Sequence, residues 1–332
     1  MLNRLVSQLA HFAVTTHKPA ESLAFYRDVI GLEVSGQEGG SAYLRGWGES
    51  FRHSLQLMEG DGPALAHIGW RAYGPEQLEE AVRRIEATGR GEGWVGAAFG
   101  RGRAYRYRGP GGHLNELFWE VERYEAPPAL KSGYPSRPQR YVPRGVAARC
   151  IDHLTVNTPD IRQDAEWYRD TLGHRWMEYI TADDDPSRII FGTTTTGERG
   201  HDLGLVPDMP GNRGRINHIA FWTEQREELR RAADVLMDNG APVEFGPGRH
   251  GVGEQDYLYC REPSGLRVEL NAGGYRNQEP DWKTVAWTVS QGGLSFYKNV
   301  TMPHSMFESF PAPRHVDEAE IMKTRAETTM FV

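Results

Sequence analysis

Residues 25–34 read FYRDVIGLEV, and residues 167–176 read WYRDTLGHRW. The two stretches share an aromatic residue, Tyr-Arg-Asp, two variable positions and a glycine. Tyr26 and Tyr168 lie 142 positions apart. A shared pattern at a long separation is typical of an internal repeat. The chain is therefore expected to contain one structural unit twice.

Three further matches surround this pair in the same order. Upstream, His11-Phe-Ala-Val matches His153-Leu-Thr-Val, again 142 positions apart. Downstream, His67-Ile-Gly-Trp matches His218-Ile-Ala-Phe, 151 positions apart. The last match joins two turns that each lead to a glutamate, Pro110-Gly-Gly-His-Leu-Asn-Glu116 and Pro263-Ser-Gly-Leu-Arg-Val-Glu269. The slowly growing offsets indicate two copies of a module of about 140 residues.

Each copy is expected to fold as an α+β unit. A short strand (9–14; 151–156) precedes a helix that ends at Gly31 or Gly173, where glycine suits the left-handed end of a helix. Further strands follow, including one with the second histidine, then a helix and a hairpin whose last strand holds the glutamate. This order predicts paired β-α-β-β-β units whose curved sheets enclose a concavity.

The repeat divides the chain into four segments. Residues 1–122 form the first module and residues 151–273 the second. Residues 123–150 contain five prolines and predict an extended linker. Residues 274–332 form a tail that only the second copy has, and a long aromatic tail of this kind is expected to cover a site. Within the tail, residues 315–325 have a charged, helix-like pattern.

Composition excludes several classes of protein. The net charge of −7 leaves no basic excess to bind a phosphate backbone, so nucleic acid is not expected as a partner. The chain contains no run of 18 apolar residues, so no membrane span is predicted. The first residues do not resemble a signal peptide. A cytoplasmic protein is therefore expected. Two cysteines, Cys150 and Cys260, are too few for a disulfide framework or a four-cysteine zinc site.

The second copy is expected to carry a metal site. His153, His218 and Glu269 fall on three separate predicted strands. Two imidazoles and one carboxylate on one face of an octahedron leave three positions open, which favours iron(II) enzymes that bind substrate and O2 at one ion. With 12 histidines in the chain, such a trio alone is weak evidence. The repeat strengthens it, because all three residues occupy fixed positions of the module.

The sequence around these residues is more specific. Residues 246–251 read GPGRHG and lead through Tyr257-Leu-Tyr259 to Pro263-Ser-Gly and then Glu269. Together with the two-copy plan, this stretch resembles the type I extradiol dioxygenases of the vicinal oxygen chelate superfamily, in particular the catechol 2,3-dioxygenase and homoprotocatechuate 2,3-dioxygenase families. The resemblance covers almost the whole chain. It implies two tandem vicinal-oxygen-chelate modules, each forming a curved open barrel.

The resemblance also implies a role for each matching residue. The two histidines and the glutamate match iron(II) ligands, although manganese(II) accepts the same set. His201 matches a histidine that handles protons beside bound O2, and His250 and Tyr259 match residues that hydrogen-bond the catecholate oxygens. The implied reaction uses O2 to open a catechol beside its two hydroxyls, giving a 2-hydroxymuconic semialdehyde. Related enzymes are commonly homo-oligomers, so a homo-oligomer is expected.

Two alternatives from the same superfamily stay open on the sequence alone. A glyoxalase-like, metal-dependent isomerase or transferase needs a further carboxylate ligand and does not need His250 and Tyr259. A ligand-binding protein without enzymatic activity leaves the two-histidine, one-carboxylate set unexplained.

The first copy is expected to be a structural module. It keeps equivalents of the three ligands, namely His11, His67 and Glu116. However, Ala97 and Arg106 stand where the second copy has His250 and Tyr259. A second metal site in the first copy is the less favoured alternative.

The substrate is expected to be a neutral catechol with an apolar substituent. Homoprotocatechuate enzymes hold a substrate carboxylate with arginines before the GPGRH stretch and in the tail, where this chain has Phe245 and Lys298. Four aromatic residues are candidates either to line an apolar pocket or to belong to the ordinary core: Phe191, Phe245, Phe296 and Tyr297.

Overall fold

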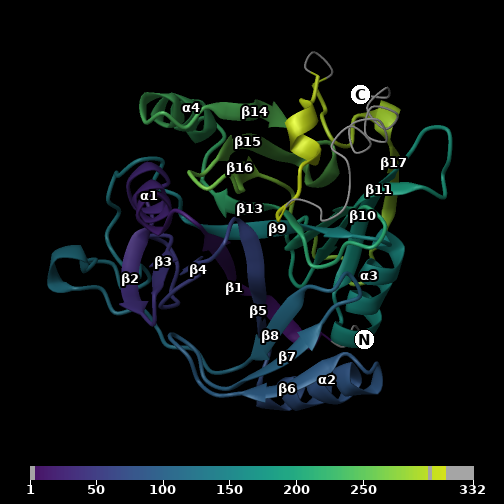
Figure 1. Ribbon diagram of the computed structural model, residues 1–332, viewed down its shortest axis with the longest axis horizontal. Helices are drawn as coiled ribbons and strands as arrows, with labels where there is room; N and C mark the ends of the chain where they lie inside the picture. Colours follow the sequence, from purple (N-terminus) through teal and green to yellow (C-terminus); the bar gives the residue numbers. More distant parts are fainter. Residues whose placement is uncertain (1–3, 298–300, 312–332) are drawn as a thin grey trace.

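The computed structural model of the chain describes residues 4–297 and 301–311. Lys298 and the expected charged helix at residues 315–325 lie outside these described residues. The described strands form two mixed sheets, one from each copy of the repeat. Figure 1 shows the first sheet, in purple and blue, below the second, in teal, green and yellow. The predicted α+β fold of two tandem modules is confirmed.

The first sheet has eight strands. They are β1 (Val6–Thr16), β2 (Glu33–Glu38), β3 (Ser41–Arg45), β4 (Leu55–Glu59), β5 (Ala64–Ala72), β6 (Gly91–Val95), β7 (Ala104–Arg108) and β8 (Leu114–Phe118). Their order in the sheet is β2-β3-β4-β1-β5-β8-β7-β6. Two helices accompany them, α1 (Pro19–Ala24) and α2 (Pro75–Ala87).

The second sheet has nine strands. They are β9 (Cys150–Thr158), β10 (Arg175–Thr181), β11 (Ile189–Thr195), β12 (Leu203–Pro207), β13 (Ile216–Trp222), β14 (Val243–Arg249), β15 (Gln255–Arg261), β16 (Arg267–Gly273) and β17 (Val285–Thr288). Their order is β14-β15-β16-β13-β9-β12-β11-β10-β17. The helices of this module are α3 (Ile161–Trp167) and α4 (Glu228–Asp238).

The repeated aromatic-Tyr-Arg-Asp motif joins the two modules. In each copy it continues the first helix as a π-helical turn, and Gly173 ends the second of these turns with a φ of +77°. The ring of Tyr26 lies 6.1 Å from that of Phe221 in the other module. The ring of Tyr168 lies 6.4 Å from that of Trp70, again across the boundary. Apolar side chains of both modules therefore form one continuous core.

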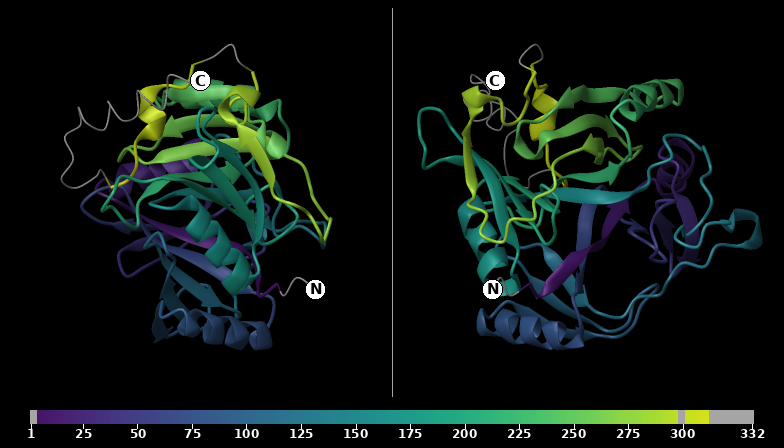
Figure 2. Two further views of the ribbon diagram at one scale, coloured as in Figure 1. Left: turned by 90° about the vertical axis from the view of Figure 1, so that its right-hand side faces the viewer. Right: turned by 180° about the vertical axis from the view of Figure 1, so that it is seen from behind.

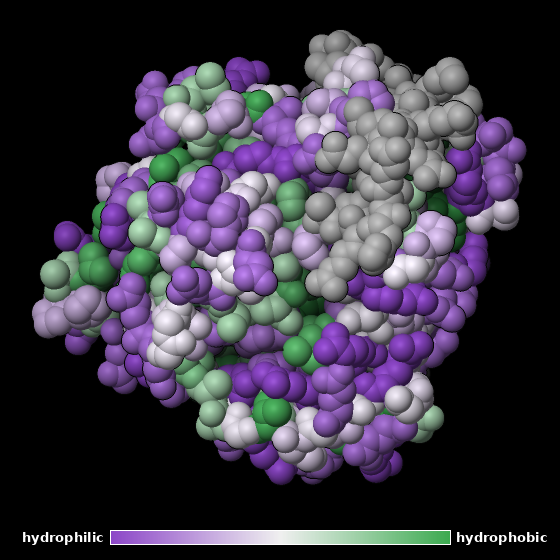
Figure 3. Space-filling model, in the orientation of Figure 1, coloured by the Kyte–Doolittle hydropathy of each residue, from purple (hydrophilic) through white to green (hydrophobic). Residues whose placement is uncertain are grey.

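The longer helices lie on the outside of the molecule. α2 and α4 lie at opposite ends, α2 beside β6 and α4 beside β14 (Figures 1 and 2). Figure 3 shows that hydrophilic side chains cover much of one face, with hydrophobic patches scattered between them. None of the helices formed by the described residues is both long enough and apolar enough to span a membrane.

The tail contains an element that the sequence pattern does not predict. β17 pairs in parallel with β10 and so extends the edge of the second sheet. Farther along, the described part of the tail makes a 3₁₀ turn at His304–Phe307. Met306 and Phe307 of this turn line the same cavity as the predicted ligands.

Candidate metal centre and substrate pocket

Three neighbouring strands of the second sheet bring the predicted ligand set together. His153 lies on β9, His218 on β13 and Glu269 on β16, and these strands are adjacent. The Nε2 atoms of the two histidines are 3.2 Å apart, and each lies 3.0 Å from Oε2 of Glu269. All three side chains are buried. The three atoms could therefore hold a single metal ion.

Hydrogen bonds behind the histidines place the proton of each neutral imidazole on Nδ1, so the lone pair of the inward Nε2 is available to a metal ion. The carboxylate of Asp152 can only accept, so Nδ1 of His153, at 2.8 Å, carries the proton. Oδ1 of Asn217 accepts from Nδ1 of His218 at 2.8 Å, because its Nδ2 donates to the carbonyl of Met306. Two imidazole lone pairs and a carboxylate then face one another, and this arrangement is repulsive unless a cation lies between them. The residues present fit a divalent metal ion.

The electrostatics of the site also favour a positive charge. Burial opposes a charged imidazole at His153, but Glu269 and Asp152 outweigh it and raise its pKa to about 9. Burial dominates at His218 and lowers its pKa to about 4. Burial alone would raise the pKa of Glu269, but the two histidines hold it well below its usual range. When no metal is bound, one proton supplies the charge that an ion would bring.

The other three predicted residues surround the same ligands. The ring centroid of His201 lies 4.1 Å from that of His153. Burial holds the pKa of His201 well below 6.5, and its Nδ1 finds no hydrogen-bond partner in the described part of the chain. His250 follows β14, and its Nε2 lies 3.1 Å from the hydroxyl of Tyr259 on β15 and 3.9 Å from Oε1 of Glu269. Burial raises the pKa of Tyr259 well above 10, so its hydroxyl keeps its proton.

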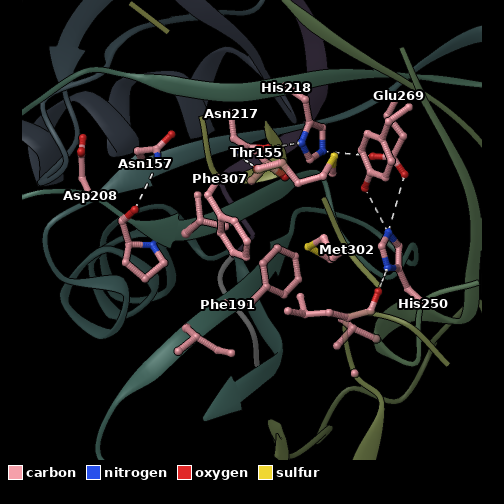
Figure 4. Close-up of a pocket in the computed structure, with 18 of the residues that line it drawn as sticks. Thr155, Asn157, Phe191, Asp208, Asn217, His218, His250, Glu269, Met302 and Phe307 are labelled. Carbon is pink, nitrogen blue, oxygen red and sulfur yellow. Dashed lines mark hydrogen bonds and ion pairs between the residues drawn. The ribbon is translucent and has the colours of Figure 1, made fainter. Parts of the chain in front are cut away.

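A cavity of about 490 Å³ opens beside these residues. Figure 4 shows His218, Glu269 and His250 at one end, with Asn157 and Asp208 at the other. The wall between them is mainly apolar and comes from strands and loops of the second module and from the tail. Its apolar residues are Ile190, Phe191, Val206, Pro207, Met209, Pro210, Val252, Val289, Leu294, Met302, Met306 and Phe307.

The four aromatic residues expected to line the pocket differ in position. Phe191 does line the pocket. Phe245 does not line the pocket and belongs to the core instead, buried behind the wall with its ring 6.3 Å from that of Tyr259. Phe296 and Tyr297 are 53% and 50% exposed. For these two the expectation is wrong, because the tail reaches the surface there.

Comparisons with known proteins agree with this geometry. The Glyoxalase/Bleomycin resistance protein/Dioxygenase superfamily matches the chain twice, over residues 8–117 and 150–270. The metapyrocatechase of Geobacillus stearothermophilus is 33% identical over 285 residues, which cover 86% of this chain and 86% of that protein. The manganese-dependent 2,3-dihydroxybiphenyl 1,2-dioxygenase of Geobacillus genomosp. 3 is 33% identical over 298 residues, covering 88% and 94%. This chain belongs to the extradiol dioxygenases of that superfamily.

Solved structures share the fold of this extradiol dioxygenase. The homoprotocatechuate 2,3-dioxygenase of Arthrobacter globiformis has a TM-score of 0.80 and 28% identity, over 92% of each chain. The 2,3-dioxygenase LapB of Pseudomonas sp. KL28 has a TM-score of 0.78 and 26% identity, over 86% of this chain and 98% of that one. The family expected from the sequence is confirmed, in preference to the isomerase and ligand-binding alternatives.

Sequence reasoning missed the residues that support the ligands of this dioxygenase. Asp152 and Asn217 each come directly before a ligand histidine, and each bonds to its Nδ1. At the equivalent positions the first module has Ala10 and Ala66. Comparing the residue before each histidine in the two copies could have found this difference. Such supporting hydrogen bonds fix the orientation of a ligand ring and its protonated nitrogen.

Two polar residues of the pocket were also missed. Thr155 and Asn157 follow His153 at every second position of β9, so all three face the pocket. Among the described residues, Oγ1 of Thr155 and Oδ1 of Asn157 are buried without a hydrogen-bond partner. They could therefore bind polar groups of a ligand. The alternation of side chains along a strand was the signal that could have identified them.

The first module assembles an equivalent group from His11, His67 and Glu116. The Nε2 atoms of the two histidines are 2.9 Å apart. Here, however, two arginines hold the carboxylate. Arg101 lies 2.7 Å from Oε2 of Glu116, and Arg106 donates to Oε1 at 2.9 Å. A divalent ion at this group would have to compete with two guanidinium charges.

Proposed function

We propose that this dioxygenase uses O2 to open a catechol at the ring bond beside its two hydroxyls, forming a 2-hydroxymuconic semialdehyde. One atom of O2 enters the new aldehyde and the other enters the new carboxylate. The observation that carries the proposal is that one apolar cavity joins the two-histidine, one-carboxylate set to His201, His250 and Tyr259. Relatives named as a metapyrocatechase and a dihydroxybiphenyl dioxygenase support the proposal.

The proposed cofactor is iron(II). His153, His218 and Glu269 would hold it, and a set of three protein ligands leaves coordination positions for substrate and O2. When bound, iron(II) gives the electrons of the catechol ring a path to O2. Manganese(II) accepts the same ligands, and one relative is named as manganese-dependent. Loading the metal-free protein with each ion and comparing the turnover distinguishes the two.

The surrounding side chains suit a substrate that must lose protons. A catechol hydroxyl gives up a proton when it binds as an anion, and neutral His250 can accept one at Nε2. Burial lowers the pKa of His250, which keeps the ring neutral before substrate arrives. Tyr259 remains protonated and can donate a hydrogen bond to a catecholate oxygen. His201 is neutral, with Nδ1 unpartnered among the described residues, so it can hold a proton and return it.

The pocket favours a neutral catechol with an apolar substituent. Its volume falls in the range of roughly 300–1,000 Å³ that holds ligands larger than a single ring. Among the described residues, Arg215 is the only arginine or lysine in the lining. Asp208 neutralises it, with Nε donating to Oδ1 at 3.1 Å. A substrate carboxylate would therefore find no free cation among the described residues of the lining, whereas an alkyl or aryl group would contact Phe191 and Phe307.

A panel of catechols tests the proposal. Iron(II)-loaded protein, prepared without air, is mixed in air with catechol, 3-methylcatechol, 2,3-dihydroxybiphenyl and a carboxylated catechol. We expect O2 uptake and a yellow product with the first three, and a much lower kcat/KM with the carboxylated compound. Preference for the carboxylated catechol would contradict the substrate class. The absence of O2 uptake with every catechol, despite bound iron, would contradict the reaction.

A further inference from the structure

The tail holds the loop that carries His250. Residues 251–252 of this loop donate their backbone N–H groups to the carbonyl oxygen of Gly293, at 3.0 and 3.1 Å. His250 donates its Nδ1–H to the carbonyl oxygen of Leu294. Its Nε2 is then the nitrogen that faces the hydroxyl of Tyr259. The orientation of His250 therefore depends on the position of the tail.

The packing between loop and tail leaves no space. A Cβ atom on Gly251 would lie 2.7 Å from the carbonyl oxygen of Gly292 and 3.1 Å from the ring of Trp287. A side chain at this position would displace backbone, so glycine is required for the close approach. Because the loop and the segment that begins with β17 are in direct contact, a shift of one is passed to the other.

One buried carboxylate binds both the loop that carries His250 and the tail to the second sheet. Oε1 of Glu178, on β10, accepts the N–H of Gly253 at 2.9 Å and the hydroxyl of Tyr275 at 2.5 Å. Oε2 accepts the indole N–H of Trp287 at 2.6 Å. Glu178 is 3% exposed and does not line the substrate pocket. A carboxylate suits this position because three donors converge on it and it offers only acceptors.

We propose that Glu178 is a positioning residue for ring cleavage. It holds the loop through Gly253 and the tail through Trp287, and together these contacts keep His250 directed toward Tyr259. The inference rests on the proposed function, since its effect on turnover acts through His250. It gives β17 a role beyond extending the sheet, because this strand fixes the orientation of a proton-accepting side chain.

A conservative variant tests this role. Glu178→Gln replaces one acceptor oxygen with a donating amide, which opposes at least one of the three donors. In iron-loaded protein we expect the amides of residues 251–253 to exchange with deuterated water about tenfold faster or more. We also expect kcat to fall about ten- to a hundredfold, with KM and iron content little changed. Trp287→Phe, which removes only the indole donor, is expected to give smaller changes in the same direction.

Two comparisons separate positioning from a general loss of structure. Glu279→Gln makes the same change of charge at an exposed position nearby, and should alter neither exchange nor kcat. In a His250→Asn background, Glu178→Gln should lower kcat no further, because the side chain it orients is gone.

An equal loss of kcat in both backgrounds, or unchanged exchange of residues 251–253, would overturn the inference. A wild-type protein without ring cleavage would instead count against the proposed function. In that case the exchange rates would still decide whether Glu178 holds the loop.

Discussion

At the scale of single residues, the side chain before each ligand histidine differs between the two modules. Asp152 and Asn217 orient the histidines of the second module, whereas alanines stand in the first. The glutamates differ as well, because Arg101 and Arg106 hold Glu116. Arg106 lies directly opposite Glu116 in the pairing of β7 with β8, where the second module has a tyrosine. Equivalent backbones thus carry a candidate metal centre in one copy and an internal ion pair in the other.

The support of His153 gives a first prediction. Asp152→Asn removes the charge that stabilises the protonated Nδ1 of the ligand ring. We expect the affinity for iron(II) to fall about ten- to a hundredfold, as is usual when a partner of a ligand is lost. Competition with a chelator measures this affinity. Asp234→Asn, at an exposed position of α4, is the matched control and should bind iron like the wild type.

The arginines of the first module give a second prediction. We expect the wild-type chain to bind one equivalent of iron(II). Replacing Arg101 and Arg106 with alanine removes the charges that neutralise Glu116, and should allow a second equivalent to bind. Metal analysis after desalting measures both values. Adding His11→Ala should remove the second equivalent again, while two equivalents in the wild type would contradict this account of the first module.

His201 gives a third prediction. It contacts the ring of His153 but lies outside the ligand set. His201→Phe should keep its iron, because no ligand is lost, and should lower kcat about a hundredfold or more through loss of proton transfer. Iron content and initial rates with catechol measure the two effects. Wild-type kinetics in this variant would remove His201 from the reaction.

At the scale of elements, contacts between the modules include buried polar groups. Asp164 on α3 accepts the backbone N–H of Gly111 in the first module at 3.0 Å, and its other oxygen bonds to the hydroxyl of Thr158. Burial raises the pKa of Asp164 to about 6, although Thr158 and Gly111 oppose this effect. The protonated form is therefore favoured in the folded chain relative to the unfolded one.

This raised pKa gives a fourth prediction. Between pH 4 and 6 the folded state binds more protons at Asp164 than the unfolded state, so the free energy of unfolding falls as pH rises. From pH 4 to pH 7 the loss is at most about 3 kcal/mol. The Asp164→Asn variant should lack this part of the pH dependence of its unfolding free energy. Chemical denaturation of both proteins at pH 4 and pH 7 measures the difference. Equal pH dependence in both proteins would contradict the assignment.

How far the sequence predicts each element depends on whether the repeat contains it. The ligands were predictable because duplicated modules place equivalent residues on equivalent strands. The tail was expected to cover a site, but neither β17 nor the residues at 302–307 that form the pocket wall could be identified, since the tail has no counterpart in the first copy and its position depends on tertiary contacts. The exposure of Phe296 and Tyr297 was missed for a related reason. Aromatic residues are buried on average, but this average does not place any one of them.

At the scale of the whole molecule, the two modules depend on each other. Phe12 of the first module and Phe221 of the second pack together in the shared core, with their ring centroids 5.9 Å apart. The repeat predicted two modules, but their relative placement depends on such contacts and could not be predicted from either copy. A homo-oligomer and a cytoplasmic location stay predictions. Light scattering of the purified protein tests the first and cell fractionation the second.

One metal ion, held by His153, His218 and Glu269, is proposed to support extradiol cleavage. The most direct measurement combines iron content, O2 uptake and product formation from 3-methylcatechol, in the wild type and in Glu269→Gln. We expect one iron per wild-type chain, equal amounts of O2 consumed and yellow product formed, and loss of both iron and turnover in the variant. Full turnover without metal, or an active variant that keeps its iron, would contradict this proposal.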